Sequence, residues 1–140
     1  MKKILLLVTL LSGTYTFAQT IDNGEKHKIV FQFVSGDTLS QHGLVNNLRN
    51  LREVWPKAEV EVVFHSNGIF MVMSEKTKYT KELQDFAEQK AIKLVVCENT
   101  MKQKKIVRSQ LLPFVSTVPM AIGEIVIKQE QGWSYLKAGL

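Results

Sequence analysis

Residues 28–56 read KIVFQFVSGDTLSQHGLVNNLRNLREVWP, and the two halves of this stretch decide the fold. The first half, Lys28 to Val34, is rich in β-branched and aromatic residues and runs into a Ser-Gly-Asp turn, which predicts a strand. The second half places an apolar residue at every third or fourth position, which predicts a helix with one apolar face. These residues are Leu44, Leu48, Leu51 and Trp55. The helix begins either at Asp37 or at a capping box of Thr38 and Gln41, and the following proline ends it.

The same alternation continues to the end of the chain. Further strands are predicted at 59–66, 91–97, 115–119 and 133–139. Helical spacing fills the intervals, with predicted helices around Leu83, over 98–114 and over 121–132. The short segment Ile69 to Met73 fits either a buried strand or a helical turn packed against the sheet. Strands and helices that alternate in this way predict an α/β domain with a mainly parallel sheet of five strands and helices on both faces.

The first 18 residues have the pattern of a signal peptide. Two lysines precede an apolar stretch, and the Thr-Phe-Ala at 16–18 has the small-x-small form of a cleavage site. The apolar stretch, Ile4 to Leu11, is well short of the roughly 20 residues that cross a bilayer, so we expect cleavage rather than an uncleaved anchor, and no stable membrane insertion afterwards. The expected organisation is a signal peptide at 1–18, a flexible tail at 19–26 and one domain at 27–140. The expected location is the periplasm or the exterior of the cell.

The charge balance does not fit a typical nucleic-acid binder. The whole chain carries a net charge of +5, and without the two leader lysines 16 basic residues face 13 acidic ones, a net charge of +3. The one basic cluster, Lys102 to Arg108, lies in a predicted helix without an interleaved aromatic residue, so we interpret it as a solvated face. We therefore expect no nucleic-acid partner.

The sequence contains no motif for a cofactor or a metal ion. The loop SGDTLS after the first strand has a single glycine and no following lysine, unlike a phosphate-binding loop. The three histidines lack the spacing of metal ligands, and there is no Cys-x-x-Cys pair. We therefore expect neither a cofactor nor a metal site.

The single cysteine, Cys97, ends the third predicted strand and precedes a helix. A thiol at this position faces the positive end of the helix dipole, which lowers its pKa, whereas the neighbouring Glu98 opposes a second negative charge. Open α/β sheets bind ligands at the carboxyl ends of their strands, and His65 ends the preceding strand. Three roles remain open for the thiol: a buried packing residue, a partner in a disulfide between chains, or a free reactive group.

Five stretches of the chain occur in a characteristic order. They are HKIVFQFVSGD (27–37), NNLRNL (46–51), VEVVFHSNGI (60–69), VVCENTM (95–101) and VPMAIGEIVIKQEQGWSYLKAG (118–139). Their order and spacing resemble those of the DsrE/DsrF-like family of small sulfur-relay proteins, and the resemblance covers residues 27–140. The closing residues Gln129, Gly132, Trp133 and Tyr135 are similar to those of the exported, single-domain branch.

This resemblance implies a three-layer flavodoxin-like fold, assembly into a homo-oligomer (a trimer or hexamer), and a sulfur-relay partner protein. It places the sulfur-bearing position at Cys97, as a persulfide, with Asn99 and the loop of His65, Asn67 and Gly68 beside it. The first functional hypothesis is an exported sulfur carrier or sulfurtransferase-like protein that uses the Cys97 thiolate. The alternative is a non-catalytic binding or assembly module in which Cys97 is structural. In that case the apolar segment 69–73 and the region of Trp133 form a subunit interface.

Overall fold

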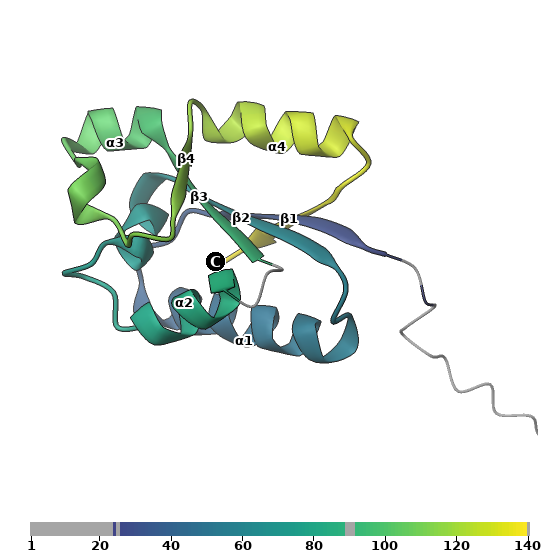
Figure 1. The fold of residues 1–140 in the computed structure, drawn as a ribbon. Coiled ribbons are helices and arrows are strands. Elements are labelled where there is room, and N and C mark those ends of the chain that lie inside the picture. The colour runs from purple at the N-terminus through teal and green to yellow at the C-terminus, as the bar shows by residue number, and fades with distance from the viewer. Residues whose placement is uncertain (1–23, 25, 89–91, 140) are drawn as a thin grey trace, which may run out of the picture.

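Five strands form one parallel sheet (Figure 1). The computed structural model describes residues 24, 26–88 and 92–139, so the predicted signal peptide lies outside the described residues. The strands are β1 (Lys28–Phe33), β2 (Glu59–Phe64), β3 (Ile92–Cys97), β4 (Ser116–Val118) and β5 (Ser134–Ala138). They lie in the order β4-β3-β2-β1-β5, and all four pairings are parallel. The predicted sheet is confirmed.

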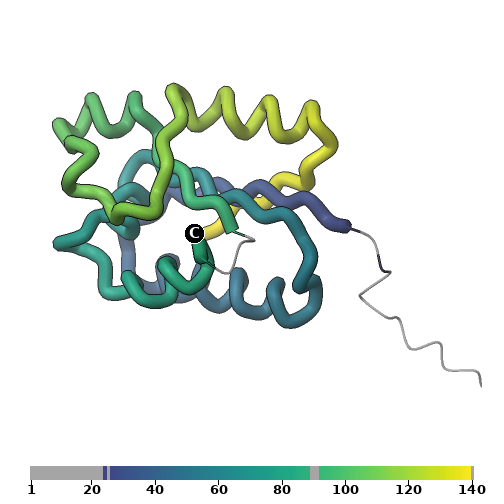
Figure 2. The backbone as a smooth tube through the Cα atoms, in the orientation of Figure 1, coloured from purple at the N-terminus to yellow at the C-terminus, as the bar shows by residue number. Residues whose placement is uncertain are grey.

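Helices cover both faces of the sheet and complete a three-layer, flavodoxin-like arrangement (Figure 2). α1 (Thr38–Val54) and α2 (Thr80–Glu88) pack on one face, and α3 (Glu98–Lys104) and α4 (Ala121–Glu130) lie on the other. The connection from β4 to β5 runs back across the sheet, opposite to the step from β1 to β2, so right-handed crossovers place α1 and α4 on opposite faces. We call these the α1 face and the α4 face. No helix in the described part of the chain is long and apolar enough to cross a membrane.

The core is larger on the α1 face than on the α4 face. On the α1 face, Phe31, Phe33 and Phe64 of the sheet belong to the same buried cluster as Leu44 and Leu48 of α1. Because successive strand residues point to opposite faces, their neighbours line the other side. The smaller cluster on the α4 face consists of Val30, Val63, Val95, Cys97, Val118, Ala121 and Ile125. The predicted site residue Cys97 therefore lies on the face of the sheet that has the smaller apolar cluster.

Asp37 caps α1, which resolves the two alternatives for the start of this helix. Its Oδ1 accepts a hydrogen bond from the backbone N–H of Ser40 at 2.7 Å. Hydrogen bonds from the side chain of Ser35 and from Ser40 lower the pKa of Asp37 to about 2. A backbone N–H in the first turn of α1, which has no partner within the helix, thus donates to a carboxylate. The negative charge of this carboxylate also interacts favourably with the positive end of the helix dipole.

The helix predicted over 98–114 is wrong in extent. α3 ends after seven residues, because Lys105 takes a left-handed conformation with φ of 55°. The chain then forms a 3-10 turn, η2 (Arg108–Gln110), and buries Leu111 and Leu112 on the α1 face. The guanidinium of Arg108 holds this loop by donating to three backbone carbonyl groups at 2.6 to 3.2 Å. A continued α3 on the α4 face would leave both leucines away from the larger core.

The segment 69–73 lies largely in a 3-10 helix, η1 (Ser66–Val72), rather than in a strand. Ile69 and Met71 are fully buried in the core of the α1 face, which confirms the alternative of a helical turn packed against the sheet. Gly68 allows this close packing, because a Cβ atom there would lie 2.3 Å from the carbonyl oxygen of Phe33. Position 68 therefore has no room for the Cβ atom of any other residue.

We predict that Gly68→Ala lowers the free energy of unfolding by at least about 2 kcal/mol, because the added methyl group must displace the backbone of β1. Gly43→Ala is the matched control, since Gly43 lies inside α1 and an added Cβ meets nothing within 4 Å. It should instead raise the free energy of unfolding by about 0.5–1 kcal/mol. Urea denaturation measures both. Equal effects of the two substitutions would contradict the prediction.

Candidate functional site

Cys97 is buried at the carboxyl edge of the sheet. It is the last residue of β3, occupies the N-cap position of α3, and is 5% exposed. Its side chain belongs to the apolar cluster of the α4 face, together with Val63 and Val118. The thiol is therefore not a freely exposed group.

The sulfur of Cys97 lies at the starts of two helices, α3 and α4. The backbone N–H of Ala121, the first residue of α4, donates to Sγ at 3.3 Å. In the first turn of α3, the backbone N–H groups of Thr100 and Asn99 and the hydroxyl of Thr100 contribute to lowering the pKa of the thiol, although the Cys97 side chain makes no capping hydrogen bond to this helix. The pairing of Cys97 with Val118 across β3 and β4 brings the start of α4 to the thiol. The sulfur thus accepts a hydrogen bond from a residue that lies 24 positions later in the sequence.

These donors favour the thiolate. Burial alone raises the pKa of Cys97, but the hydrogen bonds from Thr100, Ala121 and Asn99 outweigh burial, so the pKa lies below the ordinary value of a cysteine. Glu98, which was expected to oppose the thiolate, accepts a hydrogen bond from the hydroxyl of Thr117 at 2.8 Å. Thr117 is next to the partner of Cys97 on β4, so it faces the other side of the sheet.

His65 lies in a hydrogen-bond network beside the thiol rather than in direct contact with it. Its Nε2 lies 2.8 Å from Nε2 of Gln32, whose amide oxygen accepts from the hydroxyl of Tyr135. Its Nδ1 lies 3.1 Å from the hydroxyl of Ser66, and the backbone N–H of Ser66 donates to Oγ1 of Thr100 at 3.3 Å. Burial lowers the pKa of His65, which keeps its ring neutral. The His65 loop therefore reaches Cys97 through Thr100.

The other three predicted site residues have different surroundings. The backbone N–H of Asn99 helps to lower the pKa of the Cys97 thiol. The Oδ1 of Asn67 accepts a hydrogen bond from Nζ of Lys104 at 2.8 Å, in an exposed position. Gly68 provides close packing against β1, as described above. Of these residues, Asn99 is the one that affects the pKa of the thiol.

Sequence reasoning missed two functional groups, Thr100 and Ala121. Thr100 is 5% exposed and follows Cys97 by three residues. A hydroxyl in the first helical turn after the cysteine could therefore have been predicted to lie near the thiol. Ala121 donates with a backbone group that every residue other than proline has. Its role depends on the pairing of β3 with β4, and a side chain could not indicate it.

A cavity of about 890 Å³ lies at the opposite, amino end of the strands. Lys57, Glu59, Lys93 and Trp133 are among the residues that line it, and Cys97 is not. Among the described residues, no three histidine, cysteine, aspartate or glutamate side chains form a group that could hold a metal ion. The cavity and the thiol are thus separate features.

We predict that Thr100→Val raises the pKa of the Cys97 thiol, because the hydroxyl donor is lost while the backbone donors remain. The substitution also leaves the N–H of Ser66 without its acceptor, at a cost of about 1 kcal/mol. A pH titration of the ultraviolet absorbance of the thiolate measures the pKa. Thr100→Ser keeps the hydroxyl and serves as the control. A valine variant with an unchanged thiol pKa would show that the hydroxyl does not matter.

The sequence matches the DsrE/DsrF-like family over residues 14–138. The structure is similar to that of MTH1491 from Methanobacterium thermoautotrophicum, a protein of unknown function, with a TM-score of 0.76 and 26% identity over 80% of this chain and 99% of that chain. It also has the fold of the ychN protein from E. coli, with a TM-score of 0.65 and 17% identity over 79% of this chain and 98% of that chain. No curated protein matches the chain. With its fold and most of its length matched, the chain belongs to the DsrE/DsrF-like family.

Proposed function

We propose that this protein is a sulfur carrier, in which Cys97 acts as a thiolate and holds a sulfur atom as a persulfide. The observation that carries the proposal is the hydrogen bond from the Ala121 N–H to Sγ at the start of α4, and the groups in the first turn of α3 also lower the pKa of the thiol. Such donors favour the anion, which is the nucleophilic form of a thiol. Membership of the DsrE/DsrF-like family supports the same function.

In the proposed reaction, the Cys97 thiolate attacks the terminal sulfur of a persulfide donor. An S–S bond forms between Sγ and that sulfur, the S–S bond of the donor breaks, and the donor leaves as a thiolate with the electron pair of the broken bond. Atoms and electrons balance without an external oxidant. Delivery to an acceptor thiolate is the same step in reverse, with Cys97 as the leaving thiolate.

The burial of Cys97 restricts the donors that fit. A thiol that is 5% exposed and packed against Val63 and Val118 suits the terminal sulfur of a small donor better than a bulky disulfide. The same burial protects a single thiol from crosslinking in an oxidising compartment, which agrees with export through the signal peptide predicted from residues 1–18. Export to the periplasm or the exterior, a trimer or hexamer, and a relay partner are parts of the same proposal.

Incubation with thiosulfate or polysulfide is expected to add the mass of one sulfur atom to the protein, since the Cys97 thiolate accepts a sulfane sulfur. Intact-mass spectrometry detects the adduct, and dithiothreitol should remove it. Cys97→Ser is the control and should gain no mass. An adduct on the serine variant, or none on the native protein, would refute the sulfur-carrier function.

A second candidate function, an assembly module, is favoured by exposed apolar side chains on α4. Ile122, Val126 and Ile127 are 44 to 52% exposed, although a solvated helix face is usually polar. The interface expected from segment 69–73 is wrong, because Ile69 and Met71 are fully buried within one chain. The outer side of α4 is instead the surface that a second copy of the chain would cover, and this assembly is compatible with either function.

We expect the native protein to sediment as a homo-oligomer and Val126→Glu to sediment as a monomer, because a carboxylate cannot be buried there without a partner. Leu39→Glu is the matched control, since Leu39 is 77% exposed but lies on α1, on the opposite face. Analytical ultracentrifugation distinguishes the states. A monomeric native protein, or equal effects of the two substitutions, would exclude assembly through α4.

A further inference from the structure

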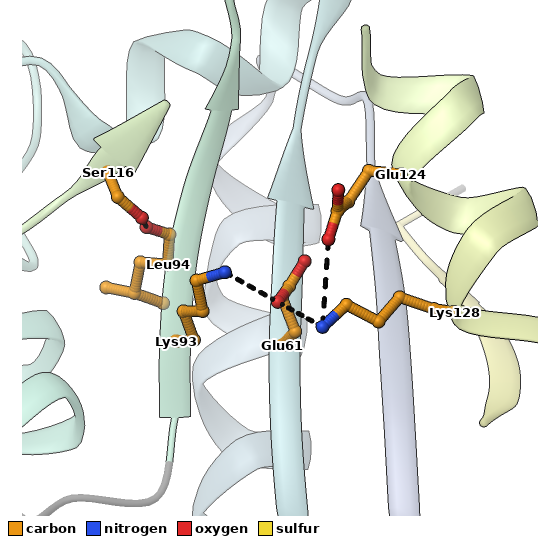
Figure 3. Close-up of polar contacts among 6 residues, drawn as sticks. All are labelled: Glu61, Lys93, Leu94, Ser116, Glu124 and Lys128. Atoms are coloured by element: carbon orange, nitrogen blue, oxygen red, sulfur yellow. Dashed lines mark hydrogen bonds and ion pairs between the residues drawn. The ribbon is translucent and has the colours of Figure 1, made fainter. Parts of the chain in front are cut away.

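Glu61 is a fully buried carboxylate at the centre of the α4 face (Figure 3). It lies on β2, and its Oε2 is 3.0 Å from Nζ of Lys128 on α4 and 3.2 Å from Nζ of Lys93 on β3. A buried carboxylate without partners is strongly destabilising, so these ammonium groups are required for this position. The sulfur transfer proposed above uses none of these three residues directly.

Glu124 of α4 lies beside the ion pair between Glu61 and Lys128. Its Oε1 lies 3.7 Å from Nζ of Lys128, one turn away on the same helix. Burial and the neighbouring carboxyl group of Glu61 raise the pKa of Glu124, and the positive charge of Lys128 acts in the opposite direction. Figure 3 shows the two carboxyl groups on the same side of the sheet, with Lys128 beside them. α4 is thus joined to β2 by the ion pair between Lys128 and Glu61, with the carboxyl group of Glu124 beside it.

The apolar contacts beneath α4 define its position along its axis only weakly. The sheet presents Val30, Val63 and Val95 to this helix, and contacts between small aliphatic side chains have no preferred direction. The ion pair between Lys128 and Glu61, at 3.0 Å, involves a fully buried carboxylate, so a slide of the helix would leave that carboxylate without this partner. Within the described residues, it is the ion pair that joins α4 to the sheet. It is therefore suited to fix the register of the helix.

We propose that Lys128 is a positioning residue for the Cys97 thiol: its ion pair with Glu61 fixes α4 along the sheet and so holds the Ala121 N–H at 3.3 Å from Sγ. Lys128 follows Ala121 by seven residues, or about 10 Å along the helix axis, so it acts on the sulfur through the helix. The inference rests on the proposed function only in that both use the Cys97 thiolate.

Lys93 provides a second lysine within the same cluster for comparison, with a side chain that is 56% exposed where that of Lys128 is 14% exposed. It also pairs with Glu61, and it lies on the α4 face four residues before Cys97 on β3, about 13 Å along the strand. Lys93→Met and Lys128→Met each remove one positive charge at a similar distance from the thiol. The difference is that the ion pair of Lys93 joins two strands, whereas that of Lys128 joins a strand to α4.

The experiment titrates the thiolate by its ultraviolet absorbance in the native protein, Lys128→Met, Lys93→Met and Lys128→Arg, with Cys97→Ser as the blank for tyrosine ionisation. We expect an upward shift of the thiol pKa in Lys128→Met, no comparable shift in Lys93→Met, and recovery in Lys128→Arg, which restores the charge. Circular dichroism shows which variants are folded. If Lys128→Met does not fold, Glu61→Gln/Lys128→Met replaces it, because that pair leaves no buried charge without its main partner.

Equal shifts of the thiol pKa in Lys128→Met and Lys93→Met would show that the loss of a positive charge alone explains the shift. This outcome would overturn the positioning role of Lys128. An unchanged pKa in Lys128→Met would overturn it as well. Both outcomes are independent of sulfur loading, which mass spectrometry of the native protein measures separately. A native protein that takes up sulfur while Lys128→Met keeps its thiol pKa refutes the positioning role alone, and a shifted pKa without sulfur uptake refutes the carrier function alone.

Discussion

The return of the chain across the sheet after β4 is the constraint on which the rest of the structure depends. β4 pairs with β3 at one edge and β5 pairs with β1 at the other, so the connection between them must cross the α4 face. α4 is that connection. Its first residue donates to the thiol at the end of β3, and Lys128 in its last turn meets Glu61 at the centre of β2. The hydrogen bond to the thiol and the ion pair between Lys128 and Glu61 therefore both involve one helix.

The repeating parts of the chain could be predicted from the sequence, and the parts set by contacts between distant elements could not. β1 and α1 follow local patterns, alternation ending in a turn and an apolar stripe ending at a proline. The loop after α3 departs from its helical propensity because Leu111 and Leu112 are buried on the α1 face. The position of Cys97 at the start of a helix could likewise be predicted from the sequence. The hydrogen bond from Ala121 and the burial of Glu61 could not, because both depend on the order of the strands in the sheet.

A buried thiol with several donors combines two opposing effects of a low-dielectric interior. Burial destabilises the anion of Cys97, yet the same absence of competing water strengthens each hydrogen bond that the sulfur accepts. A purely structural cysteine experiences the first effect without the second. The neutral ring of His65, held between Gln32 and Ser66, adds no charge to this balance. The reactivity of the site therefore depends on how accurately the amides are held.

The pairing of the first strand with the last also affects how the chain reaches its native state. β1 is paired by β5 over residues 29–33 and 134–138, so during synthesis one side of β1 stays unpaired until nearly the whole domain has left the ribosome. A sheet that cannot be completed early delays the closing of its core, because contacts of long sequence separation form slowly. Under the export proposed above, this order of assembly would keep the polypeptide in a translocation-competent state, at the cost of dependence on chaperones that cover the open edge.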